Sequence, residues 1–319
     1  MKPQMKYLGL ILDSHWDFKA HFEWLAAKLG SAVLSLSRIM PNLGGPGEGA
    51  RRLYMGVVRS IAMYGAPVWC GALVASSRNL DLFYREQRKM AIRVARAYRT
   101  VSREAALLMA GSVPWTYAAC TEEVTYNCKE QHARGGEPAA PEILEELRDR
   151  EKREEIRHWR ERLSRARAGL RVVEAIGPCL DEWMARERGG LSFHVTQVLS
   201  GHGCFGEYLH ERVGREASPR CHHCPETRDT AQHTLQECPA WDVERRVLMD
   251  RMGGDLSLPT VVGKMVADPE CWVAMASFCG TVVSRKEAAE RERERDPNAA
   301  PERRRRGGVR RRQYLRQQP

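Results

Sequence analysis

CHHC, at residues 221–224, opens the stretch of sequence that says most about this fold. His233 and Cys238 follow it, which gives the spacing C-x2-C-x8-H-x4-C. Three thiolates and one imidazole at such a spacing can surround a single Zn²⁺ ion tetrahedrally. Because protein atoms fill every position, the pattern predicts a closed, structural zinc site formed by Cys221, Cys224, His233 and Cys238. The alternative is four unrelated residues whose thiols are simply buried.

Basic and aromatic residues flank this stretch. Arg220 and Arg228 lie before and within it, and Trp241 and Arg245 follow shortly after it. Arginine binds phosphate groups and an aromatic ring can stack on a base, so these four residues are candidates for nucleic-acid contact. The competing interpretation is a zinc staple whose role is purely structural.

The charge balance favours a polyanionic partner. The 319 residues carry a formal net charge of +10, and nucleic acid is the first partner that such an excess suggests. Residues 285–319 hold 13 basic and 6 acidic residues with few apolar ones, which predicts a disordered Arg-rich tail. Such a tail can act as a nuclear address, as a phosphate clamp or as both.

No apolar run in the sequence is long enough to span a bilayer, so we expect no membrane partner. The ten cysteines are spread too thinly for a secreted disulfide scaffold. Together with the basic tail, this predicts an intracellular, nuclear protein.

Hydrophobic periodicity predicts a mainly α fold after a short β segment. Residues 6–13 are apolar and β-prone, whereas residues 17–40 and 48–64 carry apolar side chains at steps of three and four. In the second of these helices we expect Leu53, Val57, Ile61 and Tyr64 to face the core.

A further helix, expected over residues 77–98, carries a basic stripe. Arg85, Lys89, Arg93 and Arg96 follow one another at helical spacing, and no Asp or Glu falls on the same stripe. These side chains can track a phosphate backbone. The alternative is the solvated face of a surface helix.

Three stretches, in the same order along the chain, resemble the reverse transcriptases of non-LTR retrotransposons. Residues 6–13, KYLGLILD, resemble the Tyr-Leu-Gly strand at their boundary between palm and thumb. Residues 53–69 resemble the Tyr-Gly-x-x-x-Trp helix of their thumb. The run LSGHG at 199–203, with the Cys/His stretch behind it, resembles their C-terminal Gly-His-Gly and CCHC module.

The resemblance is strongest to the type I elements that insert into insect ribosomal RNA genes. It implies a C-terminal fragment, thumb plus CCHC region, of a Pol polyprotein that is an RNA-directed DNA polymerase with an endonuclease. The implied partners are the RNA template, the target DNA and the remainder of the parent polyprotein. Tyr7, Leu8 and Gly9 are then expected to help hold the primer end.

Polymerase chemistry in that family needs palm carboxylates that hold Mg²⁺. The chain contains no Asp-Asp dipeptide, so we expect Mg²⁺ only in the palm of the parent and no catalytic residues in this fragment. Two other functions stay open at this stage. One is an independent zinc-stapled helical module for protein interaction, and the other is a stand-alone enzyme, for which no assembled site is visible.

The resemblance and the composition together predict the domain organisation. The chain opens almost directly on a strand, which suggests the end of a palm, over residues 1–15, whose upstream part is missing. A thumb-like helical domain is expected over 16–132, and the Gly/Pro/Ala-rich residues 133–141 predict a linker. A helical connector over 142–213, a CCHC zinc-knuckle region over 214–284 and the disordered tail over 285–319 complete the expectation.

Overall fold

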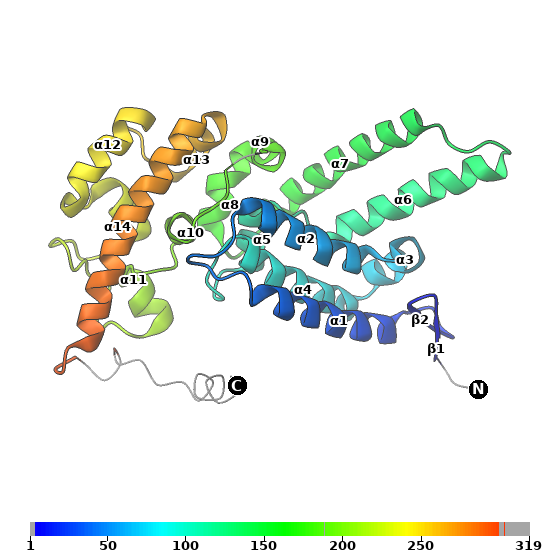
Figure 1. Ribbon diagram of the computed structural model, residues 1–319, viewed down its shortest axis with the longest axis horizontal. Coiled ribbons are helices and arrows are strands. Elements are labelled where there is room, and N and C mark those ends of the chain that lie inside the picture. The colour runs from blue at the N-terminus through cyan, green and yellow to red at the C-terminus, as the bar shows by residue number, and fades with distance from the viewer. Residues whose placement is uncertain (1–3, 188, 300–302, 304–319) are drawn as a thin grey trace. The chain divides into compact units, whose positions relative to one another are not determined.

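The computed structural model describes residues 4–187, 189–299 and 303. They form two compact units, Met1–Thr196 and Gln197–Pro319, each built mainly of helices (Figure 1). The described residues contain a single two-stranded sheet, so the mainly α fold class is confirmed. The division into units falls inside the connector that the sequence predicted over residues 142–213.

The chain begins with an antiparallel hairpin of β1, Gln4–Tyr7, and β2, Leu10–Asp13. Tyr7 pairs with Leu10, so Leu8 and Gly9 form a two-residue turn, and both have positive φ, 43° and 84°. Such values are typical of the tight turns that match the twist of the two strands. The Tyr64 hydroxyl donates a 2.8 Å hydrogen bond to the Leu8 carbonyl and fixes the turn against the helical body of unit 1.

The first four helices are α1 (Lys19–Ser37), α2 (Glu48–Met63), α3 (Ala66–Ala75) and α4 (Ser77–Val94), and aromatic rings from α1, α3 and α4 meet in one core. Trp69 packs edge-on against Phe22 and Phe83, at centroid distances of 5.3 and 5.7 Å. Trp115 lies 5.2 Å beyond Phe83. Burial of these rings supplies the main apolar stabilisation of this part of unit 1.

The predicted inward face of α2 is wrong. Leu53, Val57 and Tyr64 are 70, 41 and 57 % exposed, whereas the buried face consists of Arg51, Tyr54, Val58 and Ala62. Both stripes recur at helical spacing and are offset by one residue, so periodicity alone cannot separate them. The choice is made by tertiary contacts, among them the hydrogen bonds of Arg51 described below.

The rest of unit 1 is helical as well. α5 (Arg103–Ala110) leads into α6 (Trp115–Arg134), which packs against the long α7 (Pro141–Leu163), as Figure 1 shows. Residues 135–140 join α6 to α7, inside the stretch predicted as a linker. The unit continues through α8 (Leu170–Ile176), the 3₁₀ turn η1 (Gly177–Cys179) and α9 (Leu180–Ala185), and α10 (Phe193–Ser200) spans the division.

Unit 2 combines short turns with three longer helices. The turns are α11 (Gly206–Tyr208), the π-helical η2 (Leu209–Val213) and η3 (His233–Glu237), and the 3₁₀ turn η4 (Pro239–Trp241). The longer helices are α12 (Asp242–Met252), α13 (Leu258–Ala267) and α14 (Pro269–Arg295). α14 packs against both α12 and α13, and its Met275, Cys279 and Val282 are fully buried.

The predicted start of the disordered tail, at residue 285, is wrong. Helix α14 continues to Arg295, and Lys286, Glu287 and Glu290 are buried. A highly charged composition predicts disorder, but it does not show whether the charges find partners in the folded chain. Here they do, so the segment is helical. The remaining tail residues, apart from those up to 299 and Arg303, lie outside the described residues.

Among the described residues, no single helix is long and apolar enough to cross a bilayer. The helices α2 and α3, bent by 82° at the break between them, reach that length and apolar composition only together.

Candidate metal centre

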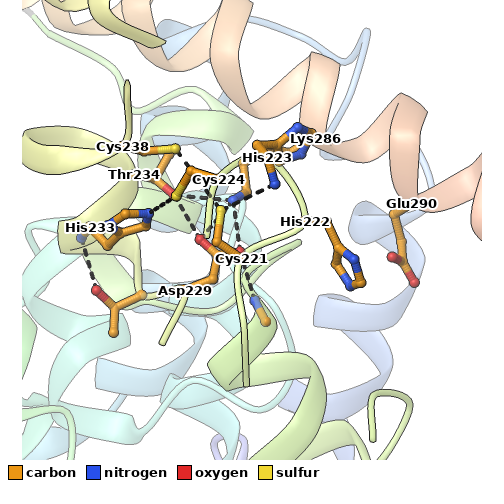
Figure 2. A network of polar contacts seen from close by, with 12 residues as sticks. Cys221, His222, His223, Cys224, Asp229, His233, Thr234, Cys238, Lys286 and Glu290 are labelled. Carbon is orange, nitrogen blue, oxygen red and sulfur yellow. Dashed lines mark hydrogen bonds and ion pairs between the residues drawn. The ribbon is translucent and has the colours of Figure 1, made fainter. Parts of the chain in front are cut away.

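Four side chains from the predicted site converge in unit 2. One ligand atom from each of Cys221, Cys224, His233 and Cys238 lies within 4.8 Å of all the others (Figure 2). Cys221 and Cys224 come from the loop after η2, His233 begins η3, and Cys238 follows the end of η3. The structure therefore brings together every residue that the sequence predicted as a ligand.

Local hydrogen bonds explain the spacing. The Cys221 amide donates to the Glu226 carbonyl, 2.9 Å away, and closes the loop that carries the first two thiols. The Cys238 amide donates to the His233 carbonyl, at 2.8 Å, which is the i to i+5 bond of a π-helical turn. That turn places the imidazole and the third thiol on the same side.

The donor set fits a tetrahedral metal ion. The Sγ atoms of Cys221 and Cys238 are 4.0 Å apart, and Cys224 Sγ lies 3.3 Å from His233 Nε2. Metal–sulfur bonds of about 2.3 Å give ligand–ligand edges of about 3.8 Å in a tetrahedron, close to these separations. Cys221, His233 and Cys238 are buried, which suits a closed site.

The electrostatics favour a thiolate at Cys221. A hydrogen bond with the Cys238 thiol is the main cause that lowers the pKa of Cys221, to about 3, and the His223 amide adds a 3.4 Å contact to its Sγ. The same thiol pair raises the pKa of Cys238. On the other side of the ring, His233 Nδ1 lies 3.5 Å from a carboxylate oxygen of Glu237, without forming a hydrogen bond to it.

A buried ion pair ties the centre to α14. The Lys286 ammonium lies 2.8 and 2.9 Å from the carboxylate oxygens of Asp229 and 3.1 Å from the Thr234 hydroxyl (Figure 2). Asp229 also accepts the Gly206 amide, at 2.9 Å. Lys286, Asp229 and Thr234 are nearly inaccessible to solvent, so one charge network joins the ligand loop, η3, α11 and α14.

This network of Lys286, Asp229 and Thr234 was not predicted from the sequence. Lys286 fell inside a segment whose composition indicated a tail, and Asp229 is one of eight residues between two ligands. A lysine or an aspartate gains such a role only from its partner, and here the partners are 57 positions apart. No local pattern in the sequence carries that information.

A glycine allows the chain to pass close to the ligand loop. A Cβ atom at Gly206 would lie 2.5 Å from the Arg220 carbonyl and 2.7 Å from that of Pro219. Such distances exclude a side chain unless the backbone moves. The close approach lets the Gly206 amide reach Asp229, and so connects the segment after the Gly-His-Gly run to the metal centre.

Two of the four flanking residues proposed to contact nucleic acid are buried. The Arg245 guanidinium donates to the carbonyls of Leu235, Thr234 and Cys238, and so caps the end of η3. Trp241 is 5 % exposed and packs against the His223 ring at 4.9 Å. In this structure both residues support the ligand loop, and neither presents a charge or a ring face to solvent.

The other two flanking residues are exposed. Arg228 forms ion pairs with Glu207, at 2.5 Å, and with Glu211, at 3.4 Å. Arg220 lies on the surface next to Cys221. Of the four, Arg220 is the residue whose position best preserves its predicted role.

The basic stripe of α4 is partly neutralised. Arg85 and Lys89 are both exposed, and both pair with the buried carboxylate of Glu86, at 3.1 and 2.8 Å. The expectation that no acidic residue lies along this stripe is therefore wrong. Arg93 is half-buried, and Arg96 lies beyond the end of α4, where its guanidinium donates to the carbonyls of Asn42 and Pro46.

Tyr7, Leu8 and Gly9, which the resemblance leads us to expect near a primer end, lie at the tip of the N-terminal hairpin. Tyr7 and Leu8 are 55 and 73 % exposed, and Gly9 completes the turn. A Cβ atom at Gly9 would lie 3.1 Å from the Tyr64 ring. The turn is thus a fixed, accessible feature of unit 1.

Comparisons with known proteins found relatives that are encoded by type-1 R1 retrotransposable elements. The chain is 27 % identical over 289 residues to a Pol polyprotein of a type-1 retrotransposable element, R1 4, from Nasonia vitripennis, covering 86 % of this chain and 70 % of the relative. It is 28 % identical over 252 residues to the R1 Pol polyprotein of Bradysia coprophila, covering 76 % and 24 %. A 115 kDa protein in the R1DM element of Drosophila melanogaster is 26 % identical, with coverage of 74 % and 24 %.

These relatives differ in length, so the chain spans most of the first relative and about a quarter of the other two. No family model matches the chain, and no solved structure matches it either.

Proposed function

We propose that this chain, a homologue over most of its length of the Pol polyproteins of type-1 R1 retrotransposable elements, is the C-terminal nucleic-acid-binding part of such a polyprotein. In this proposal the RNA-directed DNA polymerase and endonuclease activities belong to the parent, together with the Mg²⁺ of its palm. The chain itself would contact RNA template or target DNA without supplying catalytic residues.

The observation that carries the proposal is the compact cluster of Cys221, Cys224, His233 and Cys238 in a basic chain of this ancestry. Three thiols and an imidazole, mostly buried, are the donors that structural zinc sites use, so we assign Zn²⁺ to the centre. The ion would hold the ligand loop in shape, and no step of chemistry would pass through it. Arg245 and Trp241 would support the loop from within.

Exposed cations would make the nucleic-acid contacts. Arg220 stands beside the first ligand, and Arg85 and Lys89 project from α4. Each neutralised phosphate releases bound counterions, so binding of this kind weakens steeply as salt rises. Arg228 is less available because two carboxylates already hold it.

The test is fluorescence anisotropy with labelled single-stranded RNA and double-stranded DNA at about 50 and 200 mM salt. We expect micromolar binding or better at low salt, and a loss of tenfold or more at the higher salt. Arg220→Gln should weaken binding more than Arg228→Gln, because only the second guanidinium is already paired with carboxylates. The absence of binding to both nucleic acids at low salt would overturn the proposal.

The second candidate is an independent zinc-stapled module for protein interaction. Its support is a set of exposed apolar residues, Val243 and Val247 on α12 and Val273 on α14, which are 68, 65 and 62 % exposed. Apolar side chains grouped on neighbouring helices are typical of protein-binding surfaces. Under this alternative the anisotropy titrations would show no binding while the metal content stayed at one ion per chain.

We also propose a nuclear location, from the arginine runs at 303–306 and 310–312. A fluorescent fusion of the full chain should accumulate in nuclei, and replacement of both runs by glutamine should release it. Equal distribution of the two fusions would contradict this proposal.

A further inference from the structure

We propose that unit 1 contains a phosphate-binding pocket formed by the guanidinium groups of Arg51, Arg52, Arg96 and Arg186. Its ligand is a phosphate group, carried either by a nucleic-acid strand or by a free oligophosphate. The inference goes beyond the proposed function, because it gives unit 1 an anion site that needs neither the metal centre nor a reverse-transcriptase role.

The pocket is a hollow of about 460 Å³. The N-terminal half of α2 lines one side, and the ends of α4, α5 and α9 with the loop after α9 line the rest. Met55, Met109 and Met184 provide apolar, adaptable walls. All the lining residues belong to unit 1, and each lies in the described part of the chain.

The lining carries a surplus of positive charge. Four arginines face a single carboxylate, that of Glu48, which is bound by Arg52. Arg51 is only 3 % exposed, and its hydrogen bonds go to three backbone carbonyls, those of Pro41, Pro46 and Arg93. Carbonyl groups satisfy N–H donors but do not cancel the charge of a buried guanidinium, which is costly without a counter-ion.

Arg96 adds a second unbalanced cation. Its Nη atoms donate to the Asn42 carbonyl, at 3.3 Å, and to the Pro46 carbonyl, at 2.9 Å, whereas its buried Nε has no hydrogen-bond partner among the described residues. Its φ is +55°, in the left-handed region that residues with a side chain rarely adopt. The chain thus holds a guanidinium here through an unfavourable backbone conformation.

Arg186 closes the pocket from the opposite side. Its guanidinium stacks on the Trp183 ring, 3.9 Å from the centroid, and donates to the Trp183 carbonyl. Burial is the main cause that lowers the pKa of Arg186 to about 10, although the Glu48 carboxylate acts in the opposite direction. Gly111, whose φ is +63°, lies beside this guanidinium, and a Cβ atom there would be in ordinary van der Waals contact with it, at 3.4 Å.

A phosphate group would satisfy this arrangement. It brings negative charge and several acceptor oxygens, and guanidinium groups bind it through paired, charge-assisted hydrogen bonds. The methionine walls would accommodate a sugar or base attached to the phosphate. A chloride ion offers no directional acceptors and a carboxylate carries less charge, so phosphate is the ligand class that best matches four guanidiniums.

The probes are sodium pyrophosphate, a 5′-phosphorylated thymidine dinucleotide and the same dinucleotide without its 5′-phosphate. Binding to the full chain is measured by isothermal titration calorimetry, with sodium chloride at matched ionic strength as the reference. We expect saturable binding of pyrophosphate. Competition by the phosphorylated dinucleotide would identify a nucleic-acid phosphate as the ligand, and its failure to compete would identify a free oligophosphate.

Arg96→Gly is the most informative variant, because glycine accepts the φ of +55° and the variant should fold. We expect its affinity for pyrophosphate to fall at least fivefold. Arg52→Gln, at a half-exposed position, should weaken binding as well and serves if the first variant is unstable. Arg38→Gln removes one charge from an exposed position outside the pocket lining and should bind within twofold of the unchanged chain.

Two results would overturn the inference. One is a response to pyrophosphate no larger than the response to chloride at equal ionic strength. The other is equal affinity in the unchanged chain, in Arg96→Gly and in Arg52→Gln. Neither result bears on the metal centre, so failure here is distinguishable from failure of the proposed function.

Discussion

His21 is a buried, neutral histidine within the aromatic core of unit 1. It is 1 % exposed, and its ring lies between 5.7 and 6.4 Å from those of Phe18, Phe22, Trp24 and Trp69. Its Nδ1 accepts a 3.4 Å hydrogen bond from the Ile11 amide. Desolvation by burial, assisted by the charge of Lys28, lowers its pKa to about 4.

This shift makes unit 1 sensitive to mild acid. The unfolded chain binds a proton at His21 near pH 6.5 and the folded chain only near pH 4, so stability is complete above pH 6.5 and falls as pH drops toward 4. We expect the loss attributable to His21 to reach about 2 kcal/mol between pH 7 and pH 5. Urea unfolding at the two pH values measures it.

His21→Phe should remove that part of the pH dependence, whereas His15→Gln, at an exposed position, should retain it. If His21→Phe loses as much stability between pH 7 and pH 5 as the unchanged chain, the buried neutral histidine is not the cause.

At the scale of single residues, the sequence identifies the metal ligands, but it does not show which arginines are buried and which are exposed. The four metal ligands share one short stretch, and their residue types and spacing are enough to predict the cluster. Arg245 and Arg220 look alike in the sequence, yet the first caps η3 from inside and the second is exposed. Only the folded chain shows which carbonyls Arg245 reaches.

Among the elements, α14 connects most of unit 2. Lys286 projects from it into the charge network of Asp229 and Thr234, and the neighbouring Arg285 points to solvent and pairs with Glu244. Two neighbouring residues of one helix therefore form a buried ion pair and an exposed ion pair, which can be compared directly.

We expect Lys286→Met to lower the free energy of unfolding of unit 2 by about 3 kcal/mol or more, because it leaves the Asp229 carboxylate buried without its counter-ion. Arg285→Met should cost less than about 1 kcal/mol, since exposed ion pairs contribute little. Urea denaturation followed by circular dichroism compares the two. Similar losses in both variants would show that the buried pair does not anchor α14.

The buried face and the end of a helix could be predicted from the sequence where hydrophobic periodicity determines them. The predictions were wrong where tertiary contacts determine them. The apolar residues that recur at steps of three and four over residues 17–40 include Phe22, Leu25 and Leu29, and α1 buries all three. In α2 two stripes compete, and the hydrogen bonds of Arg51 to distant carbonyls select the face that periodicity did not favour. In α14 the charged C-terminal turns form a helix because their partners come from residues far away in the sequence.

At the scale of the whole molecule, the two units should respond differently to metal removal. The four ligands lie within residues 221–238, and the contacts that the structure describes for them stay inside unit 2. Metal binding to thiolates and an imidazole is coupled to folding of the segment that supplies them. Unit 1 keeps an aromatic core of its own around Trp69 and Phe83.

We therefore expect a zinc chelator to raise amide hydrogen exchange throughout residues 219–241 and to leave α3 and α6 protected. Added Zn²⁺ should restore the protection, and Cys224→Ser should show the raised exchange without chelator, because it removes one ligand. Mass spectrometry of peptic fragments resolves these segments. Unchanged exchange in 219–241 would mean that hydrogen bonds such as that of the Asp229 amide to the Pro219 carbonyl, at 2.7 Å, hold the loop without a metal. Equal loss of protection in α3 and α6 would mean that the metal stabilises the molecule as one cooperative body.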